Sequence, residues 1–207
     1  GDMQALETAL GSKDFNPDMM NRDNTKSLLI IICEKASSDM ARKLIKAGAN
    51  VNYTAPDGRT VLHHAVDTDN GELVRLLLEA GADPMAPARN GATALHDAVW
   101  SHRLNSIKAL LPAYKNVNFS PDGRHNGTPI GLAIGRGSPD VVRLFIDAGI
   151  DLNDTRYLKN PPLHHAAERG RKAMVEMFLK AGADKDRKNQ AGKTAKEVAA
   201  PSVRNLL

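Results

Sequence analysis

The chain has 207 residues, of which 42% are hydrophobic but only 4% aromatic, so its core is predicted to consist of Leu, Ile, Val and Ala. The 28 basic residues are interleaved with 24 acidic ones, and the net charge of +4 is too small to predict a nucleic-acid-binding surface. Cys33, the single cysteine, excludes an internal disulfide and is predicted to be a packed thiol; no apolar run reaches the length of a membrane span.

A block of about 33 residues recurs along the chain. Its clearest mark is a glycine turn at Gly48, Gly81, Gly149 and Gly182, with spacings of 33, 68 and 33 residues. The middle interval therefore holds two periods and two extra residues. A second mark has the same phase, at residues 60–63, 93–96, 128–131 and 161–164. Self-similarity at a fixed period indicates a stacked solenoid, for which binding is the default function.

The predicted elements alternate between a first helix and a second helix in each block. Residues 3–20 are predicted to supply the second helix and turn of an incomplete N-terminal unit, and the apolar run 28–33 predicts a buried first helix. In the next block, Thr60 is a suitable N-cap for the first helix. Residues 73–78 place Leu and Val at helical spacing, and Gly81 can adopt the left-handed conformation that ends a helix.

Both marks resemble the ankyrin repeat pattern, which reads roughly D-x-x-G-x-T-P-L-H-x-A-A, then a Val- and Leu-rich helix, then G-A-D-V-N. Residues 57–87 follow this pattern well, and residues 162–184 do so too. The resemblance implies an all-α ankyrin-repeat solenoid of helix-turn-helix pairs with β-hairpin-like tips. It implies a single domain, 1–207, with a partial N-terminal unit, five full repeats and a partial C-terminal unit; their ranges are 1–23, 24–54, 55–86, 87–121, 122–156, 157–188 and 189–207.

Two departures from the pattern fall in the middle of the chain. The third repeat has Tyr114 where the glycine turn is expected, and Pro112 is predicted to end its second helix early. Two extra residues lengthen the following tip at 120–125, and Gly131 replaces the histidine of the fourth repeat. These departures predict a soft point, a bend or a loop adapted to a partner.

Adjacent histidines at 63–64 and 164–165 raise the question of a metal site. Neighbouring helical residues point about 100° apart, so neither pair can chelate one ion as an i, i+4 pair would. The resemblance implies that His63, His96 and His164 make structural hydrogen bonds, whereas His64 and His165 are predicted to be surface or groove residues. We expect no catalytic residues, no metal, no cofactor and no enzymatic activity.

The resemblance implies that a partner contacts the hairpin tips and the exposed ends of the first helices. Trp100, the only tryptophan, falls at such a position, and tryptophan is over-represented among interface hot spots. The alternative is that Trp100 packs on a neighbouring first helix. Aromatic and basic residues also fall at the tips, where they are predicted to contact a partner; the alternative is that each tip aromatic packs down on its own hairpin. The candidate partner-binding residues are Tyr53, Arg59, Asp67, Trp100, Ser101, Phe119, Arg124, Arg136, Tyr157 and Arg169.

The leading hypothesis is a non-catalytic scaffold that binds another protein, in a sharper version as an inhibitor or protective partner of an enzyme. The alternative is a targeting or regulatory segment of a larger multidomain protein. An enzyme or ligand-binding protein with an unrecognised site is the third. We expect no nucleic-acid or membrane partner and a monomer when unbound. The start Gly1-Asp2-Met3 is compatible with a processed end, so the cytoplasm is favoured only slightly over export after signal cleavage.

Overall fold

A computed structural model describes residues 3–114, 127–153 and 160–207 of the chain. Contacts between the elements divide the chain into two compact units, Gly1–Ala113 and Tyr114–Leu207, and each is described by itself. The described residues form helices and turns but no strand, apart from isolated bridges of the Thr54–Thr60 kind. The predicted all-α architecture of stacked helix pairs is thus found in the described residues.

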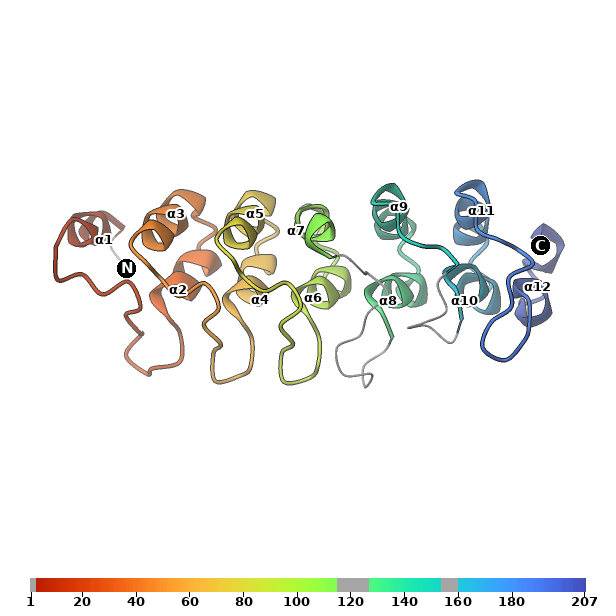
Figure 1. Ribbon diagram of the computed structural model, residues 1–207, viewed down its shortest axis with the longest axis horizontal. Helices are drawn as coiled ribbons and strands as arrows, with labels where there is room; N and C mark the ends of the chain where they lie inside the picture. Colours follow the sequence, from red (N-terminus) through yellow and green to blue (C-terminus); the bar gives the residue numbers. More distant parts are fainter. Residues whose placement is uncertain (1–2, 115–126, 154–159) are drawn as a thin grey trace. The chain divides into compact units, whose positions relative to one another are not determined.

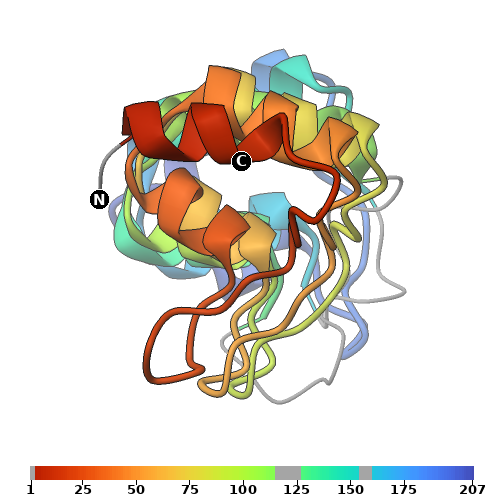
Figure 2. The same ribbon diagram turned by 90° about the vertical axis from the view of Figure 1, so that its left-hand side faces the viewer.

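The N-terminal unit is built of two helical layers (Figure 1). Its elements are α1 (Met3–Leu10), α2 (Leu28–Glu34), α3 (Ser38–Lys46), α4 (Val61–Val66), α5 (Gly71–Glu79), α6 (Ala94–Trp100), α7 (Leu104–Leu110) and the 3-10 helix η1 (Leu111–Ala113). The first helices α2, α4 and α6 pack side by side, and the second helices α1, α3, α5 and α7 form the other layer. The hairpin tips project beyond the first helices on one side (Figure 2).

The C-terminal unit repeats this arrangement. Its elements are α8 (Pro129–Arg136), α9 (Pro139–Asp147), α10 (Pro162–Glu168), α11 (Lys172–Lys180), α12 (Ala195–Val198) and the 3-10 helix η2 (Arg204–Leu206). The first helix α10 packs between α8 and α12, and the second helices α9 and α11 pack on each other. Each repeat therefore buries its apolar side against its neighbours rather than against a central core.

Turn residues end the helices where the repeat pattern predicts. Gly81 follows Ala80, the C-cap of α5, and has a φ of +89°, a left-handed conformation that glycine adopts without steric cost. The third repeat differs because Pro112 lacks the N–H that would continue α7, which ends at Leu110 and passes into η1. The predicted early end of this helix is confirmed, and the side chain of Tyr114 is buried.

The core is largely aliphatic, as predicted, but the C-terminal unit also buries two phenylalanine side chains that the prediction did not include. Phe145 in α9 and Phe178 in α11 are both 0% exposed, and each stands where α3, α5 and α7 carry Leu44, Leu77 and Leu110. A low aromatic content therefore did not exclude aromatic residues from the core, where the two rings occupy the same repeat position.

Cys33 lies in α2 and is buried, as predicted. Burial, with a smaller contribution from the charge of Glu34, raises the pKa of its thiol to about 12. The thiolate, which is the reactive form, is therefore scarcely populated at neutral pH.

Candidate functional site

The hairpin tips are closed by one repeated backbone hydrogen bond. The N–H of Ala55 donates to the carbonyl of Arg59 at 2.9 Å, and that of Ala88 donates to the carbonyl of Ala92 at 2.8 Å. Successive tips approach closely, because a Cβ on Gly58 would lie 2.8 Å from the backbone nitrogen of Arg89. A depression of about 310 Å³ remains between these two tips, lined by Asp57, Arg59, Ala88, Arg89, Asn90 and Asp97.

The first histidine of each block ties a helix to the tips, as the resemblance implies. The backbone N–H of Thr60 donates to His63 Nδ1 at 3.2 Å, so the ring proton lies on Nε2, which donates to the carbonyl of Ala92 at 3.0 Å. His96 repeats the contact of Nδ1 with Thr93. The structural role of these histidines is confirmed.

His164 makes only half of this arrangement. Its Nε2 lies 3.0 Å from the carbonyl of Lys193, but its buried Nδ1 has no hydrogen-bond partner among the described residues. The reason is local: Pro161 stands where Thr60 and Thr93 stand in the earlier blocks, and proline offers neither an N–H nor a hydroxyl.

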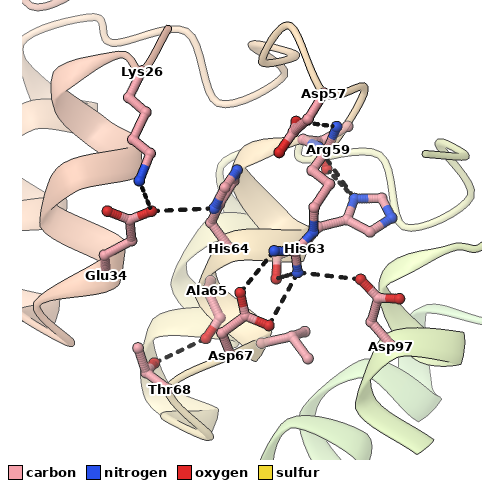
Figure 3. A network of polar contacts seen from close by, with 12 residues as sticks. Lys26, Glu34, Asp57, Arg59, His63, His64, Ala65, Asp67, Thr68 and Asp97 are labelled. Atoms are coloured by element: carbon pink, nitrogen blue, oxygen red, sulfur yellow. Dashed lines mark hydrogen bonds and ion pairs between the residues drawn. The ribbon is translucent and has the colours of Figure 1, made fainter. Parts of the chain in front are cut away.

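A guanidinium joins two first helices of the N-terminal unit (Figure 3). Arg59 Nη1 lies 2.8 Å from Asp67 Oδ2, and its Nη2 lies 3.0 Å from Asp67 Oδ1 and 3.2 Å from Asp97 Oδ2. Nη2 also donates to the carbonyl of His63 at 3.0 Å. Burial alone would lower the pKa of Arg59, but Asp67 and Asp97 outweigh it and raise that pKa. Arg59 and Asp67 thus form a bidentate ion pair, called the fork below, and Asp97 of α6 holds the guanidinium from a third side.

A second chain of polar contacts links α2 to α4. Lys26 Nζ lies 2.6 Å from Glu34 Oε1, and the same oxygen lies 3.4 Å from His64 Nδ1 (Figure 3). His64 is only 5% exposed, so the prediction of a surface or groove position is wrong for this residue. The first helix α2 packs against α4, and its Glu34 contacts His64. His165 is half-buried in α10.

Trp100 is the last residue of α6, one repeat along from Asp67, and its side chain is 55% exposed. Among the described residues only Met19, at 50%, is another large hydrophobic side chain with this exposure. Ser101 follows as the exposed C-cap of α6. Trp100 thus presents a large apolar side chain one repeat along from the paired charges of Arg59 and Asp67.

The remaining predicted site residues separate into three groups. Tyr53 lies in the N-terminal unit, where it is half-buried at the base of a tip and its carbonyl accepts from Val61 N–H at 3.2 Å. Arg136 and Arg169 lie in the C-terminal unit and are exposed. The others fall outside the described residues: Phe119, Arg124 and Tyr157.

Two arginines of the C-terminal unit lie over the end of α8. Arg171 Nη2 donates to the carbonyl of Gly135 at 2.9 Å, and Arg169 Nε donates to His165 Nε2 at 2.7 Å. Sequence reasoning selected Arg169 and placed His165 on the surface or in the groove, but it missed Arg171, as it missed Asp97 in the N-terminal unit. The position of each of these residues in the repeat can be derived from the sequence. Their contacts cannot, because they join residues on different helical turns or different repeats.

Protonation of buried histidines makes the stability of the fold sensitive to acid. Burial is the main cause that lowers the pKa of His63, His64, His164 and His165 in the folded state. Their neutral forms therefore favour folding: this stability is complete above the unfolded pKa of about 6.5 and is lost as the pH falls below it. We expect the urea concentration at the unfolding midpoint to decrease when the pH is lowered from 7.5 to 5.0.

The matched comparison is the double variant His64→Gln, His165→Gln, whose urea midpoint should fall less over the same range because two of the four groups no longer titrate. Parallel pH profiles for the two proteins would show that these two histidines contribute nothing to the acid sensitivity.

Neither a metal cluster nor a membrane span is found in the part of the chain that the structure describes. No three His, Cys, Asp or Glu side chains of these residues could hold an ion together. None of their helices is long and apolar enough to cross a membrane.

Comparison with known proteins relates these features to one family. The family model for ankyrin repeats matches in three copies, over residues 1–88, 29–120 and 115–189. The crystal structure of the ankyrin repeat domain of Bcl-3, a member of the IkappaB protein family, is 25% identical with a TM-score of 0.82. That of the human ASB11 ankyrin repeat domain is 27% identical with a TM-score of 0.70. Both alignments cover 98% of this chain and 90% of the other.

Sequence relatives match over shorter stretches. The human ankyrin repeat domain-containing protein 37 is 31% identical over 96 residues, which are 46% of this chain and 60% of that protein. The BRCA1-associated RING domain protein 1 of Caenorhabditis elegans is 29% identical over 110 residues, or 52% of this chain, and protein fem-1 homolog A of Rattus norvegicus is 28% identical over 98 residues, or 41% of it. The match spans only 15% of the length of each of these last two proteins. With a family model that covers most of its length, this chain belongs to the ankyrin repeat family.

Proposed function

We propose that this chain is a non-catalytic scaffold that binds another protein through its first helices and hairpin tips, with Trp100 as a central contact. Ankyrin repeats are generally protein–protein interaction modules, which supports the class of function. The observation that carries the proposal is the exposure of Trp100, which stands one repeat along from Asp67 and its partner Arg59. Tryptophan supplies a large, rigid contact area, and exposed apolar surface of this size favours association.

The fork makes this surface suitable for specific recognition. Arg59 is held by Asp67 and Asp97 before any partner arrives, so little side-chain freedom is lost on binding. The exposed carboxylate of Asp67 keeps acceptor capacity toward a partner, while Trp100 offers apolar contact one repeat away. A partner with an apolar side chain next to a hydrogen-bond donor would complement this part of the N-terminal unit.

In a more specific form of this proposal, the partner is an enzyme and the repeats inhibit it by covering its active site. The alternative is that the stack is the targeting segment of a larger protein. The matches to longer proteins support that alternative, since the match occupies only 15% of the length of the BRCA1-associated RING domain protein 1. In either case the recognition surface is the same, so one experiment addresses both.

Replacing Trp100 with alanine is expected to weaken partner binding about tenfold or more, because the truncation removes a hot-spot contact. A partner is first captured with the wild-type chain, then produced pure and titrated against each variant to obtain the Kd. Met19→Ala is the matched control, since it removes the other exposed large hydrophobic side chain. Assays of the partner's own activity test inhibition.

Equal Kd values for the wild-type chain and Trp100→Ala would place binding elsewhere and contradict the proposed contact. A loss that Met19→Ala shares would indicate general stickiness of exposed apolar groups rather than a site. Circular dichroism and urea midpoints equal to wild type establish that each variant is folded.

A further inference from the structure

The two units differ in charge. Residues 1–113 contain 12 basic and 14 acidic residues, a net charge of −2, whereas residues 114–207 contain 16 basic and 10 acidic residues, a net charge of +6. The small positive charge of the whole chain thus conceals a C-terminal unit that is clearly basic. A surface of this sign attracts anionic groups over the Debye length, about 8 Å at physiological salt.

Two of these basic residues are gathered at one helix end. The guanidinium carbon of Arg169 would lie 3.9 Å from a Cβ on Gly135, and Arg171 Nη1 would lie 3.0 Å from a Cβ on Gly137. Both side chains therefore reach from the region after α10 back onto the C-terminal end of α8. Gly137, with a φ of +75°, leaves room for Arg171 that other residues would fill.

Neutral acceptors hold both arginines in place. Arg171 donates to the carbonyl of Gly135 at 2.9 Å, and Arg169 donates to His165 Nε2 at 2.7 Å. Burial and the charge of Arg169 lower the pKa of His165, which keeps the ring neutral and able to accept. The partial negative charge at the end of α8 offsets part of the repulsion between the two cations.

Within the described parts of the chain, neither guanidinium is neutralised by a carboxylate. No ion pair joins Arg169 or Arg171 to an acidic side chain within residues 3–114, 127–153 and 160–207, and both residues are exposed. Arg59 in the N-terminal unit shows the opposite situation, because Asp67 and Asp97 occupy its donors. An arginine has five N–H donors, and each of these two uses one of them in a hydrogen bond to another described residue, so further donors can serve a ligand.

We propose that Arg169 and Arg171 form an oxyanion-binding site in the C-terminal unit, which takes the carboxylates of an acidic segment of the protein partner. The planar fork of each guanidinium matches a carboxylate in two parallel hydrogen bonds. Glu168, exposed beside Arg169, opposes a continuous polyanion such as nucleic acid, whereas a short acidic segment can avoid it. This inference rests on the proposed function and adds the chemistry of the partner.

The test uses the full chain and a display library of random dodecapeptides. Peptides selected on the wild-type chain are synthesised and titrated against the double variant Arg169→Ala, Arg171→Ala. Lys35→Ala is the matched control, because Lys35 is exposed and stands at the repeat position of Arg169, but in the N-terminal unit. The pair Arg169→Lys, Arg171→Lys keeps the charge without the fork. Trp100→Ala is titrated in parallel.

We expect the selected peptides to be enriched in Asp and Glu and the double alanine variant to bind them about tenfold more weakly or worse, as the loss of a charge-assisted hydrogen bond predicts. Lys35→Ala should bind as wild type does, and the lysine pair should recover only part of the affinity. Replacing the peptide carboxylates by amides should reproduce the loss.

Selected peptides that lack acidic enrichment, or that bind the double alanine variant as tightly as the wild-type chain, would overturn the inference. If Trp100→Ala weakens the binding of such peptides, the proposed function stands without this inference. A phosphoserine version that binds about tenfold tighter than the Glu peptide would reassign the site to phosphate and so overturn the choice of carboxylate. If no peptide is selected at all, both proposals lose support.

Discussion

Replacing Phe178 with alanine is expected to lower the free energy of unfolding of the C-terminal unit by about 3–5 kcal/mol. The ring is 0% exposed in α11, so its removal forfeits buried apolar contacts and leaves a cavity that rigid neighbouring helices cannot fill. Urea unfolding measures the loss, and hydrogen exchange should show reduced protection in α9, α10 and α11.

Two controls separate the cavity from general damage. Phe178→Leu should cost no more than about 1.5 kcal/mol, because leucine occupies this repeat position in α5 and α7 and the change is closer to volume-conserving. Lys180→Ala on the same helix is exposed and should stay within about 0.5 kcal/mol of wild type. If Phe178→Ala behaved like Lys180→Ala, close packing of this layer would be disproved.

Replacing His63 with alanine is expected to destabilise the N-terminal unit by about 2–4 kcal/mol. The ring is 1% exposed and satisfies Thr60 N–H and the carbonyl of Ala92, two groups that cost about 1–3 kcal/mol each when buried without a partner. Urea unfolding gives the magnitude, and hydrogen exchange at residues 55–60 and 88–92 should rise because the tips lose their tie.

A double-mutant cycle with Thr60→Val tests whether the effect arises from this contact. His63 Nδ1 lies 2.8 Å from Thr60 Oγ1, so the two substitutions share an interaction and should be non-additive by about 0.5–3 kcal/mol. Strictly additive effects would mean that the two side chains act independently, which would contradict the hydrogen bond.

Much of the fold could be predicted because its determinants are local. The glycine turn at Gly81, the N-cap position of Thr60 and the early end of α7 at Pro112 depend on residues within one helical turn. The structural histidines followed from the family resemblance. In the core, by contrast, the composition did not reveal that Phe145 and Phe178 occupy a position that leucine fills elsewhere, because volume is shared between neighbouring repeats.

The candidate site could be predicted only in part. Trp100, Arg59, Asp67 and Arg169 were located by their phase in the repeat, and their roles in binding remain predictions. Burial of His64 escaped sequence reasoning because its environment includes Glu34, which is contributed by another repeat. The same holds for Asp97, which lies 38 residues from Arg59 in the chain but 3.2 Å from it in space.

The sequence by itself therefore determined the repeat, its helices and turns, and the family, since short-range periodicity, caps and glycine turns specify them. Only the tertiary structure decided which charged groups are neutralised. Arg59 meets two carboxylates and Arg169 meets an imidazole, although both were selected as exposed basic residues of a partner-binding surface. The physical reason is that electrostatic environment depends on distances between side chains, which stacking brings together from residues far apart in the chain.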